Sequence, residues 1–219
     1  MSRLVIVGAG GQARETAWIA REVGGWETVG FVVSDLARVA PYDSRDAILG
    51  DYDWLRDHRD GWDALAIGIG NPKARLKVAA ELQAEFGADP VLWPSLVHPA
   101  VVYDRGSCRL GRGVLLHPGI LGTVNLVIED FAMVNNGCTI GHETVVGAGS
   151  VVNPGANLAG GVRLGSGVLI GTGAQVLQYL TVGEGATVGA GAVVTRDVPA
   201  GATVVGVPAK PMPTRPTPS

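Results

Sequence analysis

The chain has 219 residues, 47% hydrophobic and 17% charged, so it can bury a core in one large or two small domains. Its formal net charge of −3 and isoelectric point near 5.8 give no basic footprint for nucleic acid. No apolar run reaches the roughly 20 residues that span a bilayer, and the N-terminus lacks a signal-peptide pattern. We therefore expect a soluble, cytoplasmic protein.

The chain begins with the pattern of a strand, a glycine turn and a helix. Leu4–Val7 is a short apolar run, Gly8–Ala13 fits G-x-G-x-x-A, and residues 13–23 have helical character. In a Rossmann-type unit such a turn presents backbone amides at a helix N-terminus to a phosphate. A tight turn without a ligand gives the same motif. The candidate contacts here are Gly10, Gly11 and Gln12.

The next elements are shorter. Val29–Val33 predicts a second strand that ends at Ser34 and Asp35. The Asp35 carboxylate could accept hydrogen bonds from a ribose or base, or it could equally well cap a helix or lie in a solvated turn. Residues 48–51 predict a further turn, and Tyr52–His58 predicts a short helix.

Strands and helices alternate as far as about residue 90. Ala64–Ile69 predicts a buried strand, and Lys73–Phe86 predicts a helix that Pro72 can begin. Gly70 and Asn71 form the turn between them and are further candidate substrate contacts. This alternation predicts a small parallel sheet surrounded by helices. The segment is too short for a complete dinucleotide-binding domain, which argues against an NAD-dependent oxidoreductase.

From Leu110 to Val194 the sequence repeats every six residues. Of the fourteen positions met in steps of six from Leu110 to Val188, thirteen are branched aliphatics and only Gly122 is not. The residue directly after each of these positions is often glycine, and the residue four positions after the aliphatic is usually small. This period fits neither a helix nor a simple strand, but it fits a solenoid whose short strands turn a corner every six residues. The phase is disturbed between Val102 and Leu110, so we expect an irregular first coil.

Taken together, these motifs resemble the sugar O-acyltransferase family related to sialic-acid O-acetyltransferases, which includes N-acetyltransferases of nucleotide-linked 4-amino sugars. The features that carry the resemblance are Gly8–Ala13, Gly68–Asn71, His98-Pro99, the hexapeptide repeats and Val207–Lys210. The resemblance implies a Rossmann-like nucleotide-sugar-binding domain at 1–95 and a left-handed parallel β-helix at 96–210 with three hexapeptides per coil. Residues 211–219 form a proline-rich tail, which we expect to be disordered beyond Lys210.

The resemblance also implies an activity and an assembly. The family transfers an acetyl group from acetyl-CoA without a metal, in homotrimers whose active sites lie between subunits. Products of such enzymes enter bacterial surface glycans. Acetylation of a sugar amine and of a sugar hydroxyl remain alternatives, as does a non-catalytic protein that binds a nucleotide sugar.

His142 and Glu143 are the candidate catalytic pair. His142 lies two residues after Ile140, at a corner position whose side chain is expected to point outward. The family's matching histidine is the proposed general base, so His142 would take the proton of the attacking amine or hydroxyl. Glu143 would orient the imidazole and raise its basicity. The alternative for His142 is a solvated corner histidine.

The 18-residue coil suggests further contacts. Asn135 matches a family asparagine that can bind the acceptor, although it could simply be a polar corner residue. His117 lies one coil before Asn135 and could line the acceptor pocket. Zinc chemistry of the carbonic-anhydrase kind would need about three converging histidines, whereas His117 and His142 occupy different corner phases and the repeats contain no third histidine.

Coenzyme A would lie in the groove between two solenoids, against small residues that let its pantetheine arm approach the backbone. The sequence departs from the family at Val151, because the family often has a second histidine nine residues after the catalytic one. The absence of this histidine puts the expected geometry of the acetyl-CoA thioester in doubt. Lys210 would reach the adenosine phosphates. The expected coenzyme contacts are Val151, Gly160, Thr172, Ala190 and Lys210.

Overall fold

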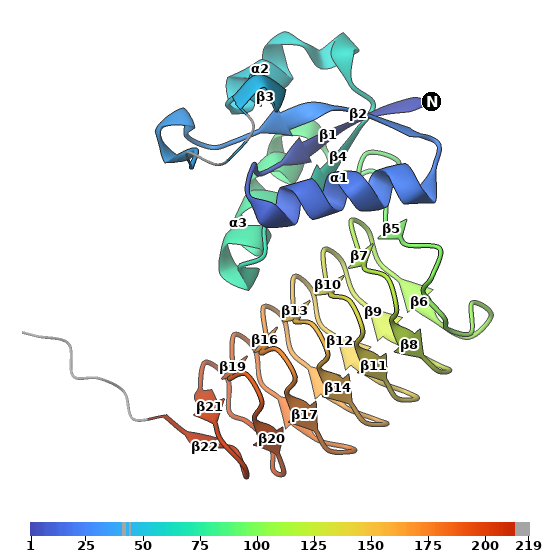
Figure 1. The fold of residues 1–219 in the computed structure, drawn as a ribbon, viewed down its shortest axis with the longest axis vertical. Coiled ribbons are helices and arrows are strands. Elements are labelled where there is room, and N and C mark those ends of the chain that lie inside the picture. Colours follow the sequence, from blue (N-terminus) through green and yellow to red (C-terminus); the bar gives the residue numbers. More distant parts are fainter. Residues whose placement is uncertain (41–42, 44, 213–219) are drawn as a thin grey trace, which may run out of the picture.

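The computed structural model describes residues 1–40, 43 and 45–212. A small α/β domain lies on one side of a long solenoid of short parallel strands (Figure 1). This is the predicted fold class, an α/β domain followed by a left-handed parallel β-helix.

The N-terminal domain is built on four parallel strands in the order β3-β2-β1-β4. The strands are β1 (Ser2–Val7), β2 (Trp26–Val32), β3 (Ile48–Gly50) and β4 (Ala64–Ile67). The helices are α1 (Gly11–Val23), α2 (Tyr52–Asp57) and α3 (Pro72–Phe86), with 3-10 turns η1 (Leu36–Arg38), η2 (Arg45–Ala47) and η3 (Arg59–Gly61). The turn predicted at residues 48–51 is wrong in part, because residues 48–50 pair in parallel with β2 as an edge strand.

The glycine motif allows α1 to pack closely on the sheet. Gly8 has φ +118°, and an added Cβ there would lie 2.8 Å from the carbonyl oxygen of Gly68. An added Cβ at Gly68 would in turn lie 2.6 Å from the Cα atom of Ala13. Only small residues permit this approach between a helix and the carboxyl ends of the strands. The motif thus has a structural purpose that does not require a ligand.

The solenoid has three sheets, one for each side of its triangular coil. The first sheet contains β5 (Leu96–Val97), β7 (Leu115–Leu116), β10 (Met133–Val134), β13 (Val151–Val152), β16 (Leu169–Ile170), β19 (Thr187–Val188), β21 (Thr203–Val205) and β22 (Lys210–Pro211). The second sheet contains β8 (Leu121–Gly122), β11 (Thr139–Ile140), β14 (Asn157–Leu158), β17 (Gln175–Val176) and β20 (Val193–Val194). The third sheet contains β6 (Arg109–Leu110), β9 (Val127–Ile128), β12 (Val145–Val146), β15 (Arg163–Leu164) and β18 (Thr181–Val182).

The predicted period of six matches the strands from β6 to β20, and coils stack with an 18-residue register such as Ile140 beside Leu158. The second residue of each strand points into the core. Glycines that follow many of these residues are required by stacking, since an added Cβ at Gly171 would lie 2.4 Å from the amide nitrogen of Ala190. A second set, three residues after the aliphatic, has left-handed backbone, such as Gly173 with φ +68°.

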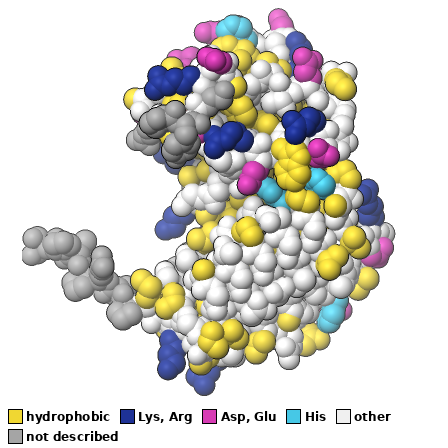
Figure 2. All heavy atoms as spheres, viewed as in Figure 1, with side chains coloured by type: hydrophobic (Ala, Val, Ile, Leu, Met, Phe, Trp, Pro, Cys, Tyr) yellow, Lys and Arg dark blue, Asp and Glu magenta, His cyan; other side chains and the backbone are white. Residues whose placement is uncertain are grey.

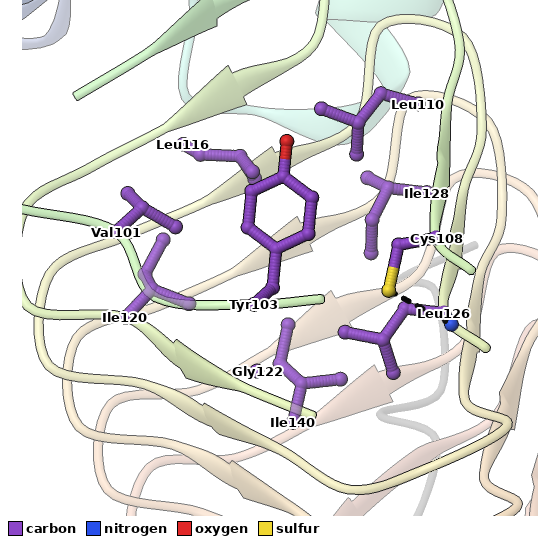
Figure 3. Close-up of a pocket in the computed structure, with 10 residues that line it drawn as sticks. All are labelled: Val101, Tyr103, Cys108, Leu110, Leu116, Ile120, Gly122, Leu126, Ile128 and Ile140. Atoms are coloured by element: carbon purple, nitrogen blue, oxygen red, sulfur yellow. Dashed lines mark hydrogen bonds between the residues drawn. The ribbon is translucent and has the colours of Figure 1, made fainter. Parts of the chain in front are cut away.

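The first coil is irregular, as expected. Figure 3 shows the Tyr103 ring lying among the aliphatic side chains at this end of the core, beside Gly122. An added Cβ at Gly122 would lie 3.1 Å from Cβ of Tyr103 and 2.8 Å from Cδ1 of Leu126. Gly122 therefore interrupts the aliphatic row because Tyr103 and Leu126 occupy the space of its side chain.

The last coil ends in an antiparallel hairpin of β21 and β22. The amide of Met212 donates to the carbonyl of Thr203 at 2.8 Å. The predicted disorder beyond Lys210 is therefore wrong for Pro211 and Met212, because they continue the pairing of the first sheet. The rest of the proline-rich tail, residues 213–219, lies outside the described residues.

The N-terminal domain covers the first sheet, with α1 between that sheet and the N-terminal strands (Figure 1). Leu115, Met133 and Val151 point outward from the first sheet into an apolar cluster with residues of β1, β4 and α1. Leu76 of α3 reaches the corner between the third and first sheets, where an added Cβ at Gly149 would lie 2.3 Å from its Cγ atom.

Arg75 of α3 joins the two domains and is fully buried. Its Nε donates to the carbonyl of Phe131 and its Nη1 to that of Ile67, both at 2.5 Å, while Nη2 donates to Gly113 at 3.3 Å. Burial lowers the pKa of the guanidinium to about 9, still above neutral pH. One cation therefore ties the end of β4 to two neighbouring coils.

Within the described part of the chain, no helix has the length and apolar character needed to cross a membrane.

We predict that Arg75→Met lowers the free energy of unfolding by roughly 3 to 5 kcal/mol, because it leaves buried carbonyls without donors. Urea denaturation followed by circular dichroism measures this. Arg56→Met removes an exposed ion pair with Glu85 and is the matched control, with little expected change. Equal effects of the two substitutions would contradict the role given to Arg75.

Candidate active site

His142 lies at the edge between the second and third sheets, after β11 and before β12. Its side chain is 50% exposed, as expected for an outward corner position. Its Nδ1 lies 3.6 Å from Oε2 of Glu143, which is within ion-pair range but longer than a hydrogen bond. Glu143 has φ +61°, a left-handed conformation that is rare outside glycine. Asn125, Phe131 and Tyr179 have the same left-handed backbone at the equivalent corner position, so this conformation belongs to the fold.

Gly160 forms the surface beneath the His142 ring. It stacks one coil after His142, as the 18-residue spacing predicted, and an added Cβ there would lie 2.4 Å from Nε2 of His142. Ala148 and Ala190 occupy the same position of the hexapeptide at the other two corners of the triangle, and Gln178 occupies it one coil later in the same column. The backbone position therefore accepts alanine, and it is the imidazole that requires glycine at residue 160.

A hollow of about 390 Å³ opens at the carboxyl ends of the N-terminal strands, and it brings Gly10 and Asp35 together. Gly10 precedes α1 without a side-chain cap, and the first turn of the helix has no acidic residue. Asp35 caps η1, its carboxylate accepting from the amide of Ala37 at 2.9 Å. This is one of the alternatives the sequence left open. Tyr52 and Ile69 also line the hollow.

Gly11, Gly70 and Asn71 do not line this hollow. Gly11 is exposed at the first position of α1. The side-chain Oδ1 of Asn71 caps α3, accepting from the amide of Ala74 at 3.0 Å. Gly70 lies beside Gln12, since an added Cβ would be 3.9 Å from Gln12 Oε1.

Gln12 instead points across the domain junction, where its Nε2 lies 3.1 Å from Nε2 of His117. His117 is only 1% exposed, and Asn135 is 4% exposed. Both lie at the edge between the first and second sheets, because they follow β7 and β10. Burial, with smaller effects of Arg75 and His98, lowers the pKa of His117 to about 4, so His117 is neutral at pH 7.

The expected coenzyme contacts divide between the edges of the solenoid. Thr172 and Ala190 are exposed at the edge between the first and second sheets, one face away from His142. Val151 is not at a groove: it is fully buried beneath the N-terminal domain. The first residue of each strand in this sheet points outward, toward the covering domain, so the expectation of a coenzyme contact at Val151 fails.

Lys210 lines a hollow of about 420 Å³ at the C-terminal end of the solenoid. Arg196, which our sequence analysis did not single out, lines the same hollow. Two positively charged side chains therefore line this hollow, where the sequence predicted one. Residues 196 and 210 are not separated by a multiple of six, so the hexapeptide repeat could not predict that they lie together.

Sequence reasoning also missed Arg75 and Tyr179. Tyr179 is 68% exposed, has φ +59° and lies two coils after Glu143 in the same corner column. The sequence did offer a signal for Tyr179, because most hexapeptides have glycine at this position and this one does not. Arg75 offered none, because its neighbours in the helix are ordinary helix formers.

In the described ranges, 1–40, 43 and 45–212, no group of three or more histidine, cysteine, aspartate or glutamate residues could hold a metal ion.

The fold and these edges define a hexapeptide-repeat acyltransferase with an α/β N-terminal domain. Residues 3–82 match the model of the PglD N-terminal domain. The structure of PerB from Caulobacter crescentus in complex with CoA and GDP-perosamine is 32% identical, with a TM-score of 0.85, and the match covers 97% of this chain and 98% of that one.

Two further structures are similar over nearly their whole length. WeeI from Acinetobacter baumannii AYE is 27% identical, with a TM-score of 0.82, over 97% of this chain and 100% of that one. The acetyltransferase domain of PglB from Neisseria gonorrhoeae FA1090, in complex with acetyl coenzyme A, is 29% identical, with a TM-score of 0.70, over 96% and 99%. No curated protein sequence matches the chain. The chain belongs to the hexapeptide-repeat sugar acyltransferase family of PerB, and it is an acyltransferase.

We predict that Gly160→Ala lowers the acyltransferase rate about tenfold or more, because the new methyl group displaces the His142 imidazole. Steady-state kinetics measures the loss, and a structure of the variant shows the ring. Thermal stability should change little, since alanine is accepted at this position of the hexapeptide elsewhere. In a His142→Ala background the same substitution should have no further effect on rate; an additional loss there would contradict this explanation.

Proposed function

We propose that the protein transfers an acetyl group from acetyl-CoA to the amine of a nucleotide-linked 4-amino sugar, with His142 as general base. The observation that carries this proposal is the near full-length likeness, at 32% identity, to a structure that contains both CoA and GDP-perosamine. The outward His142–Glu143 pair supports it independently.

The proposed chemistry is direct transfer. The sugar amine attacks the thioester carbonyl, a C–N bond forms, the C–S bond breaks, and coenzyme A leaves as a thiolate that takes up the proton His142 has received from the amine. His142 takes the proton that the amine loses, and Glu143 stabilises the imidazolium that results. The 3.6 Å separation of this pair is compatible with the role, since such hydrogen bonds often shorten only when substrate is bound.

We assign the nucleotide to the hollow at the carboxyl ends of the N-terminal strands. The amides of Gly11 and Gln12 do not line the hollow but lie next to it, at the uncapped start of α1 after Gly10. They suit a phosphate at its rim, because the helix dipole favours negative charge there. Gly10 has no side chain to block that approach, and Asp35 lines the same hollow. Gly70 and Asn71 lie at the neighbouring turn before α3 and complete the proposed substrate contacts.

We assign coenzyme A to a groove between two solenoids. Gly160 beside His142 and the exposed Thr172 and Ala190 offer surfaces against which a pantetheine arm can pack. Lys210 and Arg196 would attract the phosphates at the C-terminal end.

We further infer that each active site is shared between copies of the chain. The N-terminal domain covers the first sheet, whereas His142 lies at the opposite edge of the triangular coil, between the second and third sheets. A chain therefore presents its own nucleotide hollow away from its own His142. A homotrimer in which the second sheet packs against a neighbour would bring the two edges together.

The surface of the solenoid suits such packing. Val102 and Leu121 lie side by side on the second sheet and are 59% and 55% exposed. In the face shown in Figure 2, charged side chains gather over the N-terminal domain and toward the ends of the solenoid, while its middle carries few. The outward residues of the second sheet, Leu121, Thr139, Asn157, Gln175 and Val193, carry no charge. Charged residues are depleted at the centre of subunit interfaces, so such a face can be covered by another subunit.

The direct test uses free-thiol release from acetyl-CoA with UDP-, GDP- and dTDP-linked 4-amino-4,6-dideoxy sugars. We expect turnover of one of them, and a loss of roughly 100-fold or more in kcat for His142→Ala. His58→Ala, at an exposed histidine stacked on Trp54, is the control and should keep full activity. Equal rates for wild type and His142→Ala would exclude the base. Turnover only with hydroxyl acceptors would indicate an O-acetyltransferase, and no coenzyme A binding would indicate a non-catalytic binding protein.

Shared active sites predict complementation between two inactive variants. Gly10→Asp places a carboxylate at the phosphate site, where an added side chain meets no neighbour within 4 Å, so it should fold. Co-assembled with His142→Ala, it should restore about a quarter of wild-type activity by random mixing in trimers. Separately refolded proteins are the control. No restoration would mean that each chain serves its own His142.

A further inference from the structure

Gln12 and His117 form a direct polar contact between the two domains. Gln12 lies in the first turn of α1, and His117 follows β7 at an edge of the solenoid. Their Nε2 atoms are 3.1 Å apart. This contact links the turn proposed to hold the phosphate with the edge that carries Asn135.

The surroundings of His117 decide which of its ring nitrogens carries hydrogen. His117 is 1% exposed as a residue, and no carboxylate hydrogen-bonds to its ring among the described residues. Arg75 and His98 lie near enough to disfavour a positive charge on the ring. A neutral imidazole has one donor and one acceptor. The Gln12 amide faces the ring with its Nε2, which can only donate. In this arrangement Nε2 of His117 accepts and the hydrogen sits on Nδ1.

Three polar atoms at this place have no partner within the part of the chain that the structure describes. Nδ1 of His117 and Oε1 of Gln12 have none. Asn135 directs its Nδ2 to the carbonyl of Val152 and to Oδ1 of Asn153, at 3.2 and 3.4 Å, which leaves its own Oδ1 free. The single fully buried, unpartnered side-chain atom among the described residues is Nε2 of Gln83. Each of the three atoms therefore keeps a small exposed area, although His117 and Asn135 are only 1% and 4% exposed as residues.

The stacking of the coils holds these atoms close together. Leu116 pairs with Val134 in the first sheet, so His117 and Asn135 follow on neighbouring strands, about 4.8 Å apart. A hydroxyl group can accept from Nδ1–H and donate to an amide oxygen at the same time. The attacking amine needs its lone pair for the thioester carbonyl, so it cannot also accept from Nδ1–H.

We propose that Gln12 positions His117 in its Nδ1–H tautomer, and that His117, Gln12 and Asn135 together recognise a hydroxyl group of the acceptor sugar. This inference rests on the proposed function, and it narrows the acceptor class to amino sugars that keep a free hydroxyl next to the amine. A deoxygenated sugar would leave nearly buried polar atoms unpaired, and that loss is the source of discrimination.

The tautomer is tested without any substrate, by ¹⁵N NMR of the imidazole rings of the four histidines, with His117→Gln used for assignment. We expect His117 to remain neutral from pH 8 to pH 5, with hydrogen on Nδ1. In Gln12→Glu the carboxylate should move hydrogen to Nε2 or protonate the ring. A His117 ring with hydrogen on Nε2 in the wild type, or an unchanged ring in Gln12→Glu, would overturn the proposal.

Recognition of the hydroxyl is tested by comparing the kinetics of a sugar nucleotide with those of its 3-deoxy counterpart. GDP-perosamine is the first probe, unless the panel above identifies another sugar nucleotide as the substrate. For wild type we expect kcat/KM to fall roughly 10- to 100-fold on deoxygenation. Gln12→Met should remove most of this difference and raise KM for the sugar nucleotide, while KM for acetyl-CoA stays constant. Gln83→Met, at another half-buried glutamine, is the control.

Equal turnover of the two sugars by wild type would overturn hydroxyl recognition while leaving the acetyltransferase intact. Failure of every amino sugar would instead count against the proposed function, and the NMR result would still decide the tautomer. An equal rise in both KM values in Gln12→Met would indicate a purely structural residue.

Discussion

The structure depends on how closely successive coils of the solenoid stack. Two-residue strands pair with those 18 residues away, so every corner lies directly on the backbone of the next coil. At Gly141, Gly147 and Gly171 an added Cβ would lie 2.4 Å from backbone atoms of that coil. The same close stacking arranges side chains in columns along the edges of the solenoid. In the column that contains His142, the imidazole occupies the space that a side chain at residue 160 would fill, and glycine leaves that space open.

The second feature that determines the structure is the packing of the N-terminal domain on the first sheet of the triangular solenoid. Arg75 ties β4 to the coils at one edge of the first sheet, and Gln12 reaches His117 at the other. Between them lies an apolar layer that buries Val151. A buried cation bonded to carbonyls tolerates little displacement, since each lost bond leaves an unpaired polar group. The domain therefore has one orientation relative to the three edges.

This orientation links the fold to the proposed reaction. It places the hollow to which we assign the nucleotide and the His117–Asn135 edge on one flank, and His142 on the edge farthest from the covering domain. An acyltransferase that joins a nucleotide sugar to a thioester needs both within reach of one base. This divergence of the edges is the reason for proposing an active site shared between copies of the chain, and Glu143, with φ +61°, lies at the same edge as His142.

Much of the fold could be predicted from local pattern. The period of six identified every strand from β6 to β20, because each repeat meets the same steric demands regardless of distant contacts. The helices α1 and α3 were predicted within two residues, since a glycine turn and Pro72 mark their starts. The edge strand β3 was missed because three residues carry too little periodicity to separate a strand from a turn.

For the site, the sequence by itself determined the columns: that His142 points outward, that Gly160 stacks on it, and that His117 stacks on Asn135. Only the tertiary structure decided which sheet the N-terminal domain covers. That choice buried Val151, paired Gln12 with His117, and made Arg75 the link between domains. It depends on contacts between residues far apart in the chain, such as Arg75 with Phe131, whose geometry no local repeat encodes.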